Sequence, residues 1–152
     1  MQVWEKFKRL WKHYIFQSLL ASLSILVLVL TVGENKVVII ASMAATAFIC
    51  FAMPTSVSAQ TKNVIGGHIA GLVCGALLTL TALPYYAEFP LAVGLTILLM
   101  VALDFEHAPA AGTALAVTIN EVTLTVAVIV IISAILLTQC RYYARNILKD
   151  LI

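Results

Sequence analysis

The sequence predicts an all-α protein: a polytopic transmembrane helix bundle with about four full spans, a broken or re-entrant helical hairpin and an N-terminal interfacial amphipathic helix. Of its 152 residues, 62% are hydrophobic and 11% are charged, and the mean hydropathy is +1.06. These values lie far outside the range of soluble domains. The apolar residues also form long runs between short polar turns, and roughly 20 of them suffice to cross a bilayer as a helix.

The charge and the cysteines exclude several classes of protein. A net charge of +2 is too small to indicate nucleic-acid binding, and the basic residues gather near the two ends, where a membrane surface accounts for them. Cys50, Cys74 and Cys140 lie in or beside apolar runs without metal-ligand spacing, so we interpret them as packing residues. No catalytic triad, phosphate loop or dinucleotide fingerprint is found. We therefore expect no enzyme, cofactor or metal.

The first 13 residues predict an amphipathic helix lying in the membrane interface. Its apolar face carries two tryptophans and a phenylalanine, and its other faces carry lysine, arginine and glutamate. Residues 14–32 follow without a charge and predict the first span. We therefore divide the chain into an interfacial helix (1–13), a transmembrane domain (14–140) and a cytoplasmic interfacial tail (141–152).

Two further apolar runs follow. After a polar turn at 33–36, residues 37–53 predict a second helix, which Pro54 ends. Residues 63–83 predict a third helix that is rich in small side chains. Within it glycine recurs every four residues, at Gly67, Gly71 and Gly75. Such a ridge lets another helix backbone approach closely, either within the chain or between subunits.

The next segment is interrupted. We expect a loop at 84–90 and then an apolar run at 91–103, whose 13 residues rise only about 20 Å. The charged stretch 104–112 follows, then a short apolar piece at 110–119 and a last span at 122–140. The positive-inside rule places both termini and Lys62 on the cytoplasmic side of the cell inner (plasma) membrane. This topology requires the two short apolar runs within 91–119 to enter the membrane and return as a hairpin, with its tip at 104–112.

The tip is the first candidate binding site. Pro109 favours the first turn of a helix, and Ala110 and Gly112 would leave backbone N–H groups accessible to an anion, with the Thr113 hydroxyl nearby. Transporters use broken helices in this way. A second proline-led turn offers further polar groups. Together with the two histidines, the candidate substrate contacts are Pro54, Thr55, Ser56, Ser58, Gln60, Asn63, His68, His107, Pro109, Ala110, Gly112 and Thr113.

Both histidines leave alternatives open. His68 shares a helical face with Gly71 and Gly75, so it points into packed protein, where it either bonds a neighbouring carbonyl or belongs to a transport pathway. His107 follows Asp104 and Glu106 at the predicted break, where an intramembrane ionisable residue indicates function. The two acids are candidates for proton transfer or gating, or they only orient His107 or mark the membrane edge.

Two stretches resemble one known family. The stretch from His107 through Ala108 and Pro109 to Leu115 is similar to the signature of the HPP family of small integral membrane proteins, which is named for a His-Pro-Pro tripeptide. The block 53–68 resembles a second motif of that family. The sequence departs from it at Ala108, where the first proline of the tripeptide would stand, and at residues 61–62, where Pro-Arg is common.

The resemblance implies a four-span membrane domain, and some HPP members are implicated in nitrite transport in chloroplasts and cyanobacteria. Our leading hypothesis is a homo-oligomeric transporter or channel for a small inorganic anion, with nitrite as the first candidate. The alternatives are a non-transporting membrane scaffold or assembly protein, and a proton or cation transporter that uses Asp104, Glu106 and His107. The expected partners are the anion, the lipid bilayer and other copies of the chain.

Overall fold

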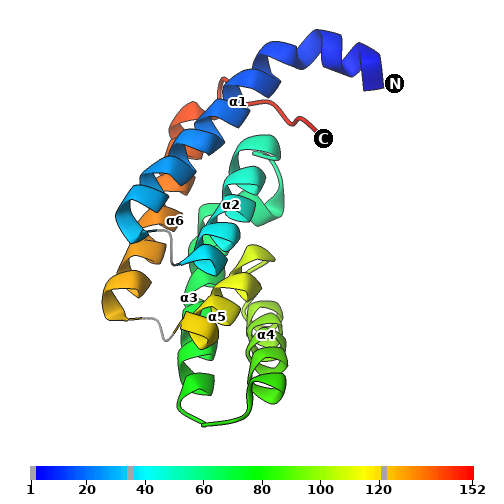
Figure 1. Ribbon diagram of the computed structural model, residues 1–152. Helices are drawn as coiled ribbons and strands as arrows, with labels where there is room; N and C mark the ends of the chain where they lie inside the picture. Colours follow the sequence, from blue (N-terminus) through cyan, green and yellow to red (C-terminus); the bar gives the residue numbers. More distant parts are fainter. Residues whose placement is uncertain (1–2, 34–35, 121–122) are drawn as a thin grey trace.

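The computed structural model describes residues 3–33, 36–120 and 123–152, and this part of the chain contains helices and no strand (Figure 1). The predicted all-α class is confirmed. In chain order the elements are α1 (Val3–Val32), α2 (Val37–Ala52), the short 3-10 helix η1 (Val57–Ala59), α3 (Thr61–Thr79), α4 (Tyr85–Ala102), α5 (Pro109–Asn120) and α6 (Leu124–Ala144).

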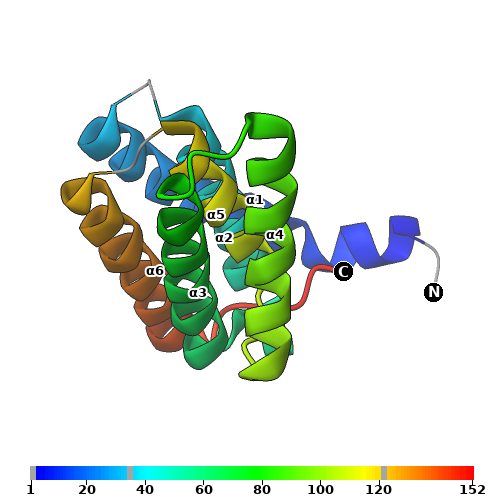
Figure 2. The ribbon, with the colours of Figure 1, turned by 90° about the horizontal axis from the view of Figure 1, so that it is seen from below.

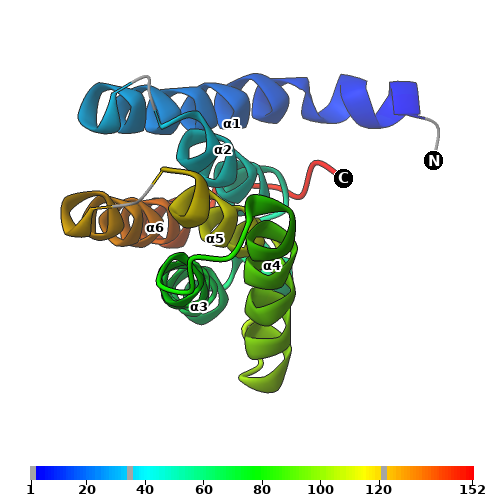
Figure 3. The ribbon, with the colours of Figure 1, turned by 60° about the horizontal axis from the view of Figure 1, so that its bottom comes forward.

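The bundle is built around α5. This helix packs against α2, α3 and α4, and its contact with α3 is the most extensive in the molecule. In Figure 3, α1 forms one outer side of the bundle and α4 another, with α2 and α5 between them. The two chain ends lie on the same side of the bundle (Figure 2). The apolar faces that α1 and α4 turn outward suit a lipid environment.

In the part of the chain that the structure describes, four helices are long and apolar enough to cross a membrane: α1, α3, α4 and α6. The two short helices are α2, with 16 residues, and α5, with 12. Twelve residues rise about 18 Å, so α5 covers little more than half of a hydrocarbon core of about 30 Å. The chain is a multi-pass membrane protein in which two short helices fill the space between full-length ones.

One predicted boundary was wrong, and two predicted segments lie on a single helix. The interfacial helix and the first span form one continuous helix, because no glycine or proline interrupts residues 3–32. The region 84–90 is not a loop: α4 begins at Tyr85, directly after Pro84, and includes Pro90. This gives α4 18 residues and makes it a full-length helix instead of half of a re-entrant pair. The predicted turn at 33–36 and the pair Asn120-Glu121 lie partly outside the described residues.

The predicted break after the fourth helix is confirmed, and its geometry is specific. Asp104 adopts a left-handed backbone conformation, with φ of 56°. The Phe105 N–H donates to the Met100 carbonyl at 2.8 Å, and the Asp104 N–H to the Val101 carbonyl at 3.4 Å. This pair of bonds is a Schellman motif, which usually places glycine where Asp104 stands. The Phe105 ring then packs on Met100, so the turn folds back against the bundle.

Both chain ends are fastened to the end of α2. Gln17 of α1 is buried; its amide donates to the carbonyls of Phe51 and Lys149, and its side-chain oxygen accepts the Lys149 N–H at 3.2 Å. The Leu151 N–H donates to the Ala52 carbonyl at 2.9 Å. The last helix also extends beyond residue 140, through Ala144, so the beginning of the predicted tail is helical. The tail therefore closes this end of the bundle.

The glycine ridge packs inside the chain. A Cβ on Gly71 would lie 2.4 Å from the Ala110 carbonyl oxygen, and one on Gly75 would lie 2.6 Å from Val117 Cβ. A Cβ on Gly67 would meet His107 Cβ at 2.9 Å. All three glycines are buried where α3 lies against α5 and the turn before it. Of the two predicted uses, the structure shows the one within the chain.

Replacing Gly71 with alanine should therefore destabilise the bundle. The new methyl group would meet backbone, which cannot rotate away, so we expect a loss of about 1–3 kcal/mol in the free energy of unfolding. The matched control is Gly94→Ala, since a Cβ on Gly94 has nothing within 4 Å. Alanine in a helix interior is favoured over glycine by about 0.5–1 kcal/mol. Unfolding in detergent micelles measures both; equal stability of the two variants would contradict the packing described.

Candidate functional site

Two buried imidazoles lie beside each other in the bundle. His68, on α3, is 0% exposed, and His107, in the turn before α5, is 1% exposed. Their ring centroids are 5.0 Å apart. His68 lies seven residues after the first residue of α3, which puts it about 10 Å below that end of the helix. An intramembrane pair of ionisable side chains is costly to bury and therefore indicates function.

A hydroxyl from α2 joins the two rings. Thr46 Oγ1 lies 3.0 Å from His68 Nε2 and 3.1 Å from His107 Nε2. Its hydrogen also lies within donating distance of the Ser42 carbonyl of its own helix, 3.1 Å away. Thr46 is 0% exposed, so no bulk water competes for these contacts. The hydroxyl thus forms the bridge between α3 and the α4–α5 turn.

The other nitrogen of His68 contacts α5. Its Nδ1 is 2.8 Å from Thr113 Oγ1, which lies 2.9 Å from Ser42 Oγ. Ser42 Oγ in turn donates to the Pro109 carbonyl at 2.7 Å. We call His68, His107, Thr46, Thr113 and Ser42 the histidine cluster. It links α2, α3 and α5 through side chains, so the carbonyl partner predicted as the plain alternative for His68 is not what the ring bonds.

His107 is held in place from the other side. Its Nδ1 is 2.8 Å from the Ser58 carbonyl oxygen and 3.5 Å from Ser58 Oγ. Ser58 belongs to η1, in the turn between α2 and α3. The two polar turns that the sequence singled out therefore meet at His107. Helix α5 begins at Pro109, as predicted, and the Ala110 N–H donates to the His107 carbonyl at 3.1 Å.

The acidic residues of the turn face away from the cluster. Asp104 Oδ2 forms an ion pair with Lys62 Nζ at 2.7 Å on the surface, and Glu106 is exposed. Neither carboxylate has a hydrogen bond to His107, so the structure does not support their predicted role in orienting that ring. Among the described residues no group of three or more His, Cys, Asp or Glu side chains could hold a metal ion.

Most of the 54–60 turn serves other purposes. Pro54 is buried and does not begin a helix, because α3 begins at Thr61 directly after Gln60. The Pro54 carbonyl accepts from Arg141 Nε at 2.7 Å. The Thr55 hydroxyl and backbone N–H bond to the Asp150 carboxylate. As predicted, the proline opens a turn, and this turn only later leads into α3.

Two predicted residues near this turn have unused polar atoms. Ser56 Oγ and Asn63 Oδ1 are buried without a hydrogen-bond partner, while Asn63 Nδ2 donates to the Val57 carbonyl at 2.8 Å. Of the turn residues, Ser58 is the one that contacts the cluster. Ala110 is fully buried in the α3–α5 contact, and Gly112 lies against Ser42, so both predicted residues support the cluster through packing.

A pocket of about 460 Å³ opens beside His107. Its walls come from the end of α4 and from the following turn: Ile97, Met100, Val101, Asp104, Phe105, Glu106, His107 and Ala108. It lies on the same side of the bundle as Lys62 and the two chain ends. Among the residues of the histidine cluster, His107 is the one that lines this pocket.

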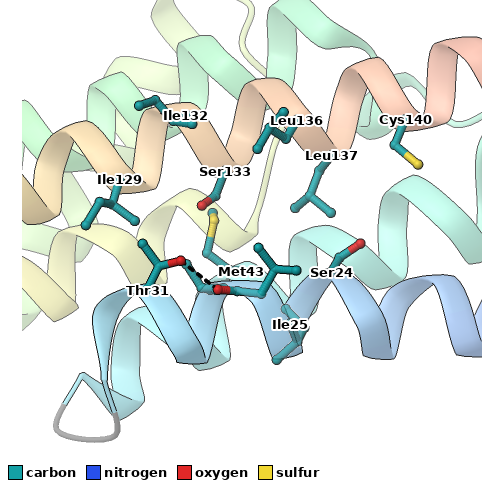
Figure 4. Close-up of a pocket in the computed structure, with 12 residues that line it drawn as sticks. Ser24, Ile25, Thr31, Met43, Ile129, Ile132, Ser133, Leu136, Leu137 and Cys140 are labelled. Atoms are coloured by element: carbon teal, nitrogen blue, oxygen red, sulfur yellow. Dashed lines mark hydrogen bonds between the residues drawn. The ribbon is translucent and has the colours of Figure 1, made fainter.

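A second, apolar groove of about 380 Å³ lies between α1 and α6 (Figure 4). Met43 of α2 also lines it, together with Ile25 and Leu137, whereas Ser42 faces the histidine cluster. The Thr31 hydroxyl, at one end, is satisfied by its own helix through the Val27 carbonyl at 2.7 Å. This groove suits a lipid chain and is separated from the cluster by α2.

Sequence reasoning missed Ser42 and Thr46. Both lie in the otherwise apolar helix 37–52, four residues apart and hence on one face. A pair of hydroxyls at that spacing in a short apolar helix is the signal that could have identified them. Their role depends on which helix lies opposite, and that information is absent from the local pattern.

Residues 6–150 match the HPP family's transmembrane region. The chain belongs to the HPP family. It is also similar to a transmembrane protein of Dictyostelium discoideum, with 39% identity over 82 residues, which cover 51% of this chain and 29% of the relative. The chain thus matches less than a third of that relative's length. No solved structure matches.

The two HPP-like stretches converge in space. The stretch from His107 contributes His107, Pro109 and Thr113, and the block 53–68 contributes Ser58 and His68. Their meeting point is the histidine cluster. Motifs separated by about 40 residues of chain thus describe one site in this HPP protein.

The Lys62–Asp104 ion pair should make the stability of the protein depend on pH. The hydrogen bond from Lys62, and then its charge, hold the pKa of Asp104 below its usual value. Because the folded-state pKa is the lower one, the pair's contribution to stability is present above the unfolded-state pKa and is lost as the pH falls through the folded-state pKa. The pair is exposed, so salt should weaken it.

Carboxyl carbon NMR titration measures this directly. Lys62→Met should raise the pKa of Asp104 towards its usual value, whereas Lys149→Met, which leaves the pair intact, should not. An Asp104 titration midpoint that is the same in wild type and Lys62→Met would contradict the ion pair.

Proposed function

We propose that this HPP protein is a transporter or channel for a small inorganic anion, with nitrite as the first candidate, and that the histidine cluster is its binding site. The observation that supports this best is the composition of the cluster: two imidazoles and three hydroxyls, buried at the start of a helix, with no carboxylate among its contacts. The proposal includes no catalytic step.

The chemistry of these groups favours an anion. A buried charge needs hydrogen bonds to replace its hydration, and hydroxyl and imidazole N–H groups supply donors when they exchange a bond within the cluster for one to the anion. The N-terminal end of α5 adds the positive end of the helix dipole beside Thr113. A buried cation would need carboxylates or several carbonyls, but the carboxylates of Asp104 and Glu106 face outward. This placement also removes the motivation for a cation pathway through those two residues.

The path to the cluster runs from the end where the basic residues gather. Every lysine and arginine of the chain except Lys36 lies on the first turns of α1, at the start of α3, or at or beyond the end of α6. The bonds from Gln17 and Thr55 to the tail bring these segments together. By the positive-inside rule this end, with both termini, faces the cytoplasm, and we propose the cell inner (plasma) membrane as the location.

We also propose that the protein works as a homo-oligomer, since a chain with four full-length helices encloses little volume for a pathway of its own. The glycine ridge does not supply the interface, because it is occupied inside the chain. That finding removes the main argument for a scaffold whose only role is assembly through those glycines.

Nitrite uptake into proteoliposomes tests the proposal. His107→Ala should lower the initial rate by about tenfold or more, since a hydrogen bond to a charged group is worth about 1.5–3 kcal/mol. His13→Ala is the matched control: it removes the remaining histidine, on the interfacial part of α1, and should leave uptake unchanged. Wild-type vesicles that take up no nitrite above protein-free vesicles would refute the nitrite claim, and equal loss in both variants would refute the site.

A further inference from the structure

The hydrogen-bond directions in the histidine cluster leave it one proton short. We propose that His68, Thr46 and His107 form a binding site for a single proton, and that this proton is the coupling ion for the anion. The proton site stands on the geometry alone, whereas the coupling rests on the proposed function.

At His107, the end of the cluster nearer the surface, a carbonyl fixes the direction of the hydrogen bond. His107 Nδ1 is 2.8 Å from the Ser58 carbonyl oxygen, which only accepts. His107 Nδ1 therefore carries a hydrogen. In the neutral ring the second nitrogen, Nε2, is then a bare acceptor, and it points at Thr46 Oγ1.

At His68, the inner end of the cluster, the direction of the hydrogen bond is fixed through two hydroxyls. Ser42 Oγ uses its hydrogen on the Pro109 carbonyl at 2.7 Å, so it must accept from Thr113 Oγ1. Thr113 has then used its hydrogen and must accept from His68 Nδ1 at 2.8 Å. His68 Nδ1 therefore carries a hydrogen, and in the neutral ring His68 Nε2 is also a bare acceptor.

Thr46 cannot satisfy both rings. Its single hydroxyl hydrogen faces His68 Nε2, His107 Nε2 and the Ser42 carbonyl, at 3.0, 3.1 and 3.1 Å. Within the helix the Ser42 carbonyl already accepts the Thr46 backbone N–H in the regular i to i−4 ladder. With both rings neutral, one imidazole nitrogen is left without a donor in a buried, water-poor site.

One added proton completes the network. If it binds at Nε2 of one ring, that N–H donates to Thr46 Oγ1, and the Thr46 hydroxyl donates to the other ring. The positive charge is then shared across Thr46 by a small rearrangement of hydrogens. A second proton would put two cations at rings whose centroids are 5.0 Å apart, in a low-dielectric interior where repulsion is strong. The geometry therefore favours one proton and opposes two.

No other charge competes for this proton among the described residues packed against the pair. On α2 and α3 the titratable groups are Cys50, Cys74 and Lys62, and Lys62 is engaged with Asp104 at the surface. On the α4–α5 turn they are Asp104 and Glu106, both exposed; α5 and η1 contribute none. None of these groups bonds to either imidazole.

The site is reached through His107. His107 lines the 460 Å³ pocket together with Asp104 and Glu106, whereas His68 is fully buried. A proton taken up from that side binds at His107 first and reaches His68 through Thr46. The charged cluster then lies beside Thr113 and the start of α5, where an anion offsets its charge. Proton and anion therefore stabilise each other, and we expect them to move together, one to one.

Nitrogen NMR of ¹⁵N-histidine protein in nanodiscs tests the proton site without any substrate. We expect His68 and His107 both to carry hydrogen on Nδ1 at high pH and to share one titration step that takes up a single proton. His13→Gln assigns the third signal. A neutral ring with its hydrogen on Nε2, or two independent titrations, would overturn the proposal.

Thr46 variants test the bridge. Thr46→Val has nearly the same shape but no hydroxyl, so the proton affinity of the pair should fall about tenfold or more, and the two rings should titrate separately. Thr46→Ser keeps the hydroxyl and should preserve the shared step. A Thr46→Val protein that still shows the shared step would also overturn the proposal.

Uptake measurements then separate the two proposals. An inward proton gradient should accelerate nitrite uptake by the wild type and by Thr46→Ser, but not by Thr46→Val. If nitrite uptake is absent while the shared titration is present, the anion proposal fails and the proton site stands. If uptake occurs without any response to the gradient, coupling through this site is refuted.

Discussion

The close contact between α3 and α5 is the constraint on which the rest of the structure depends. Gly71 and Gly75 let the α5 backbone approach to a distance at which a Cβ would overlap it, and Gly67 does the same for His107 Cβ in the turn before α5. In a bilayer this contact rests on packing, because lipid tails compete for apolar surface. The same approach brings His68 within hydrogen-bond reach of Thr113, so the packing of the bundle and the geometry of the cluster have one cause.

The two short helices follow from the same arrangement. Because α5 begins at Pro109, inside the bundle, the chain must end α4 and turn before it, and the Schellman motif at Asp104 achieves this while it packs Phe105, partly buried, against the bundle. The turn then delivers His107 to the bundle interior and leaves its acidic neighbours outside. A histidine that directly follows two acids in sequence is thus separated from both in space.

Much of the fold could be predicted from the sequence. Composition and apolar runs predict the class, Pro109 predicts the start of α5, and the four-residue glycine spacing predicts a close helix contact. The helical face of His68 predicts its burial. The start of α4 was missed because Pro90 was interpreted as a boundary, although the carbonyl it leaves without a partner lies near the end of the helix, where water can satisfy it.

The remaining features depend on tertiary contacts. That Ser42 and Thr46 complete the cluster depends on α2 lying opposite α5, and no local pattern encodes this. The use of Thr55 to hold Asp150, and of Pro54 to accept from Arg141, likewise depends on where the tail returns. Within the 54–60 turn, Ser58 therefore contacts the histidine cluster, whereas Pro54 and Thr55 hold the C-terminal tail.

The most direct test of the account is the position of a bound anion. Solid-state NMR of ¹⁵N-nitrite with ¹³C-threonine protein in lipid measures dipolar coupling between the anion and individual side chains. The account predicts coupling to Thr113 and Thr46, and its loss in the double variant Thr46→Val, Thr113→Val. Coupling to Thr31 in the groove between α1 and α6, or no coupling to any threonine under conditions where nitrite is transported, would contradict it.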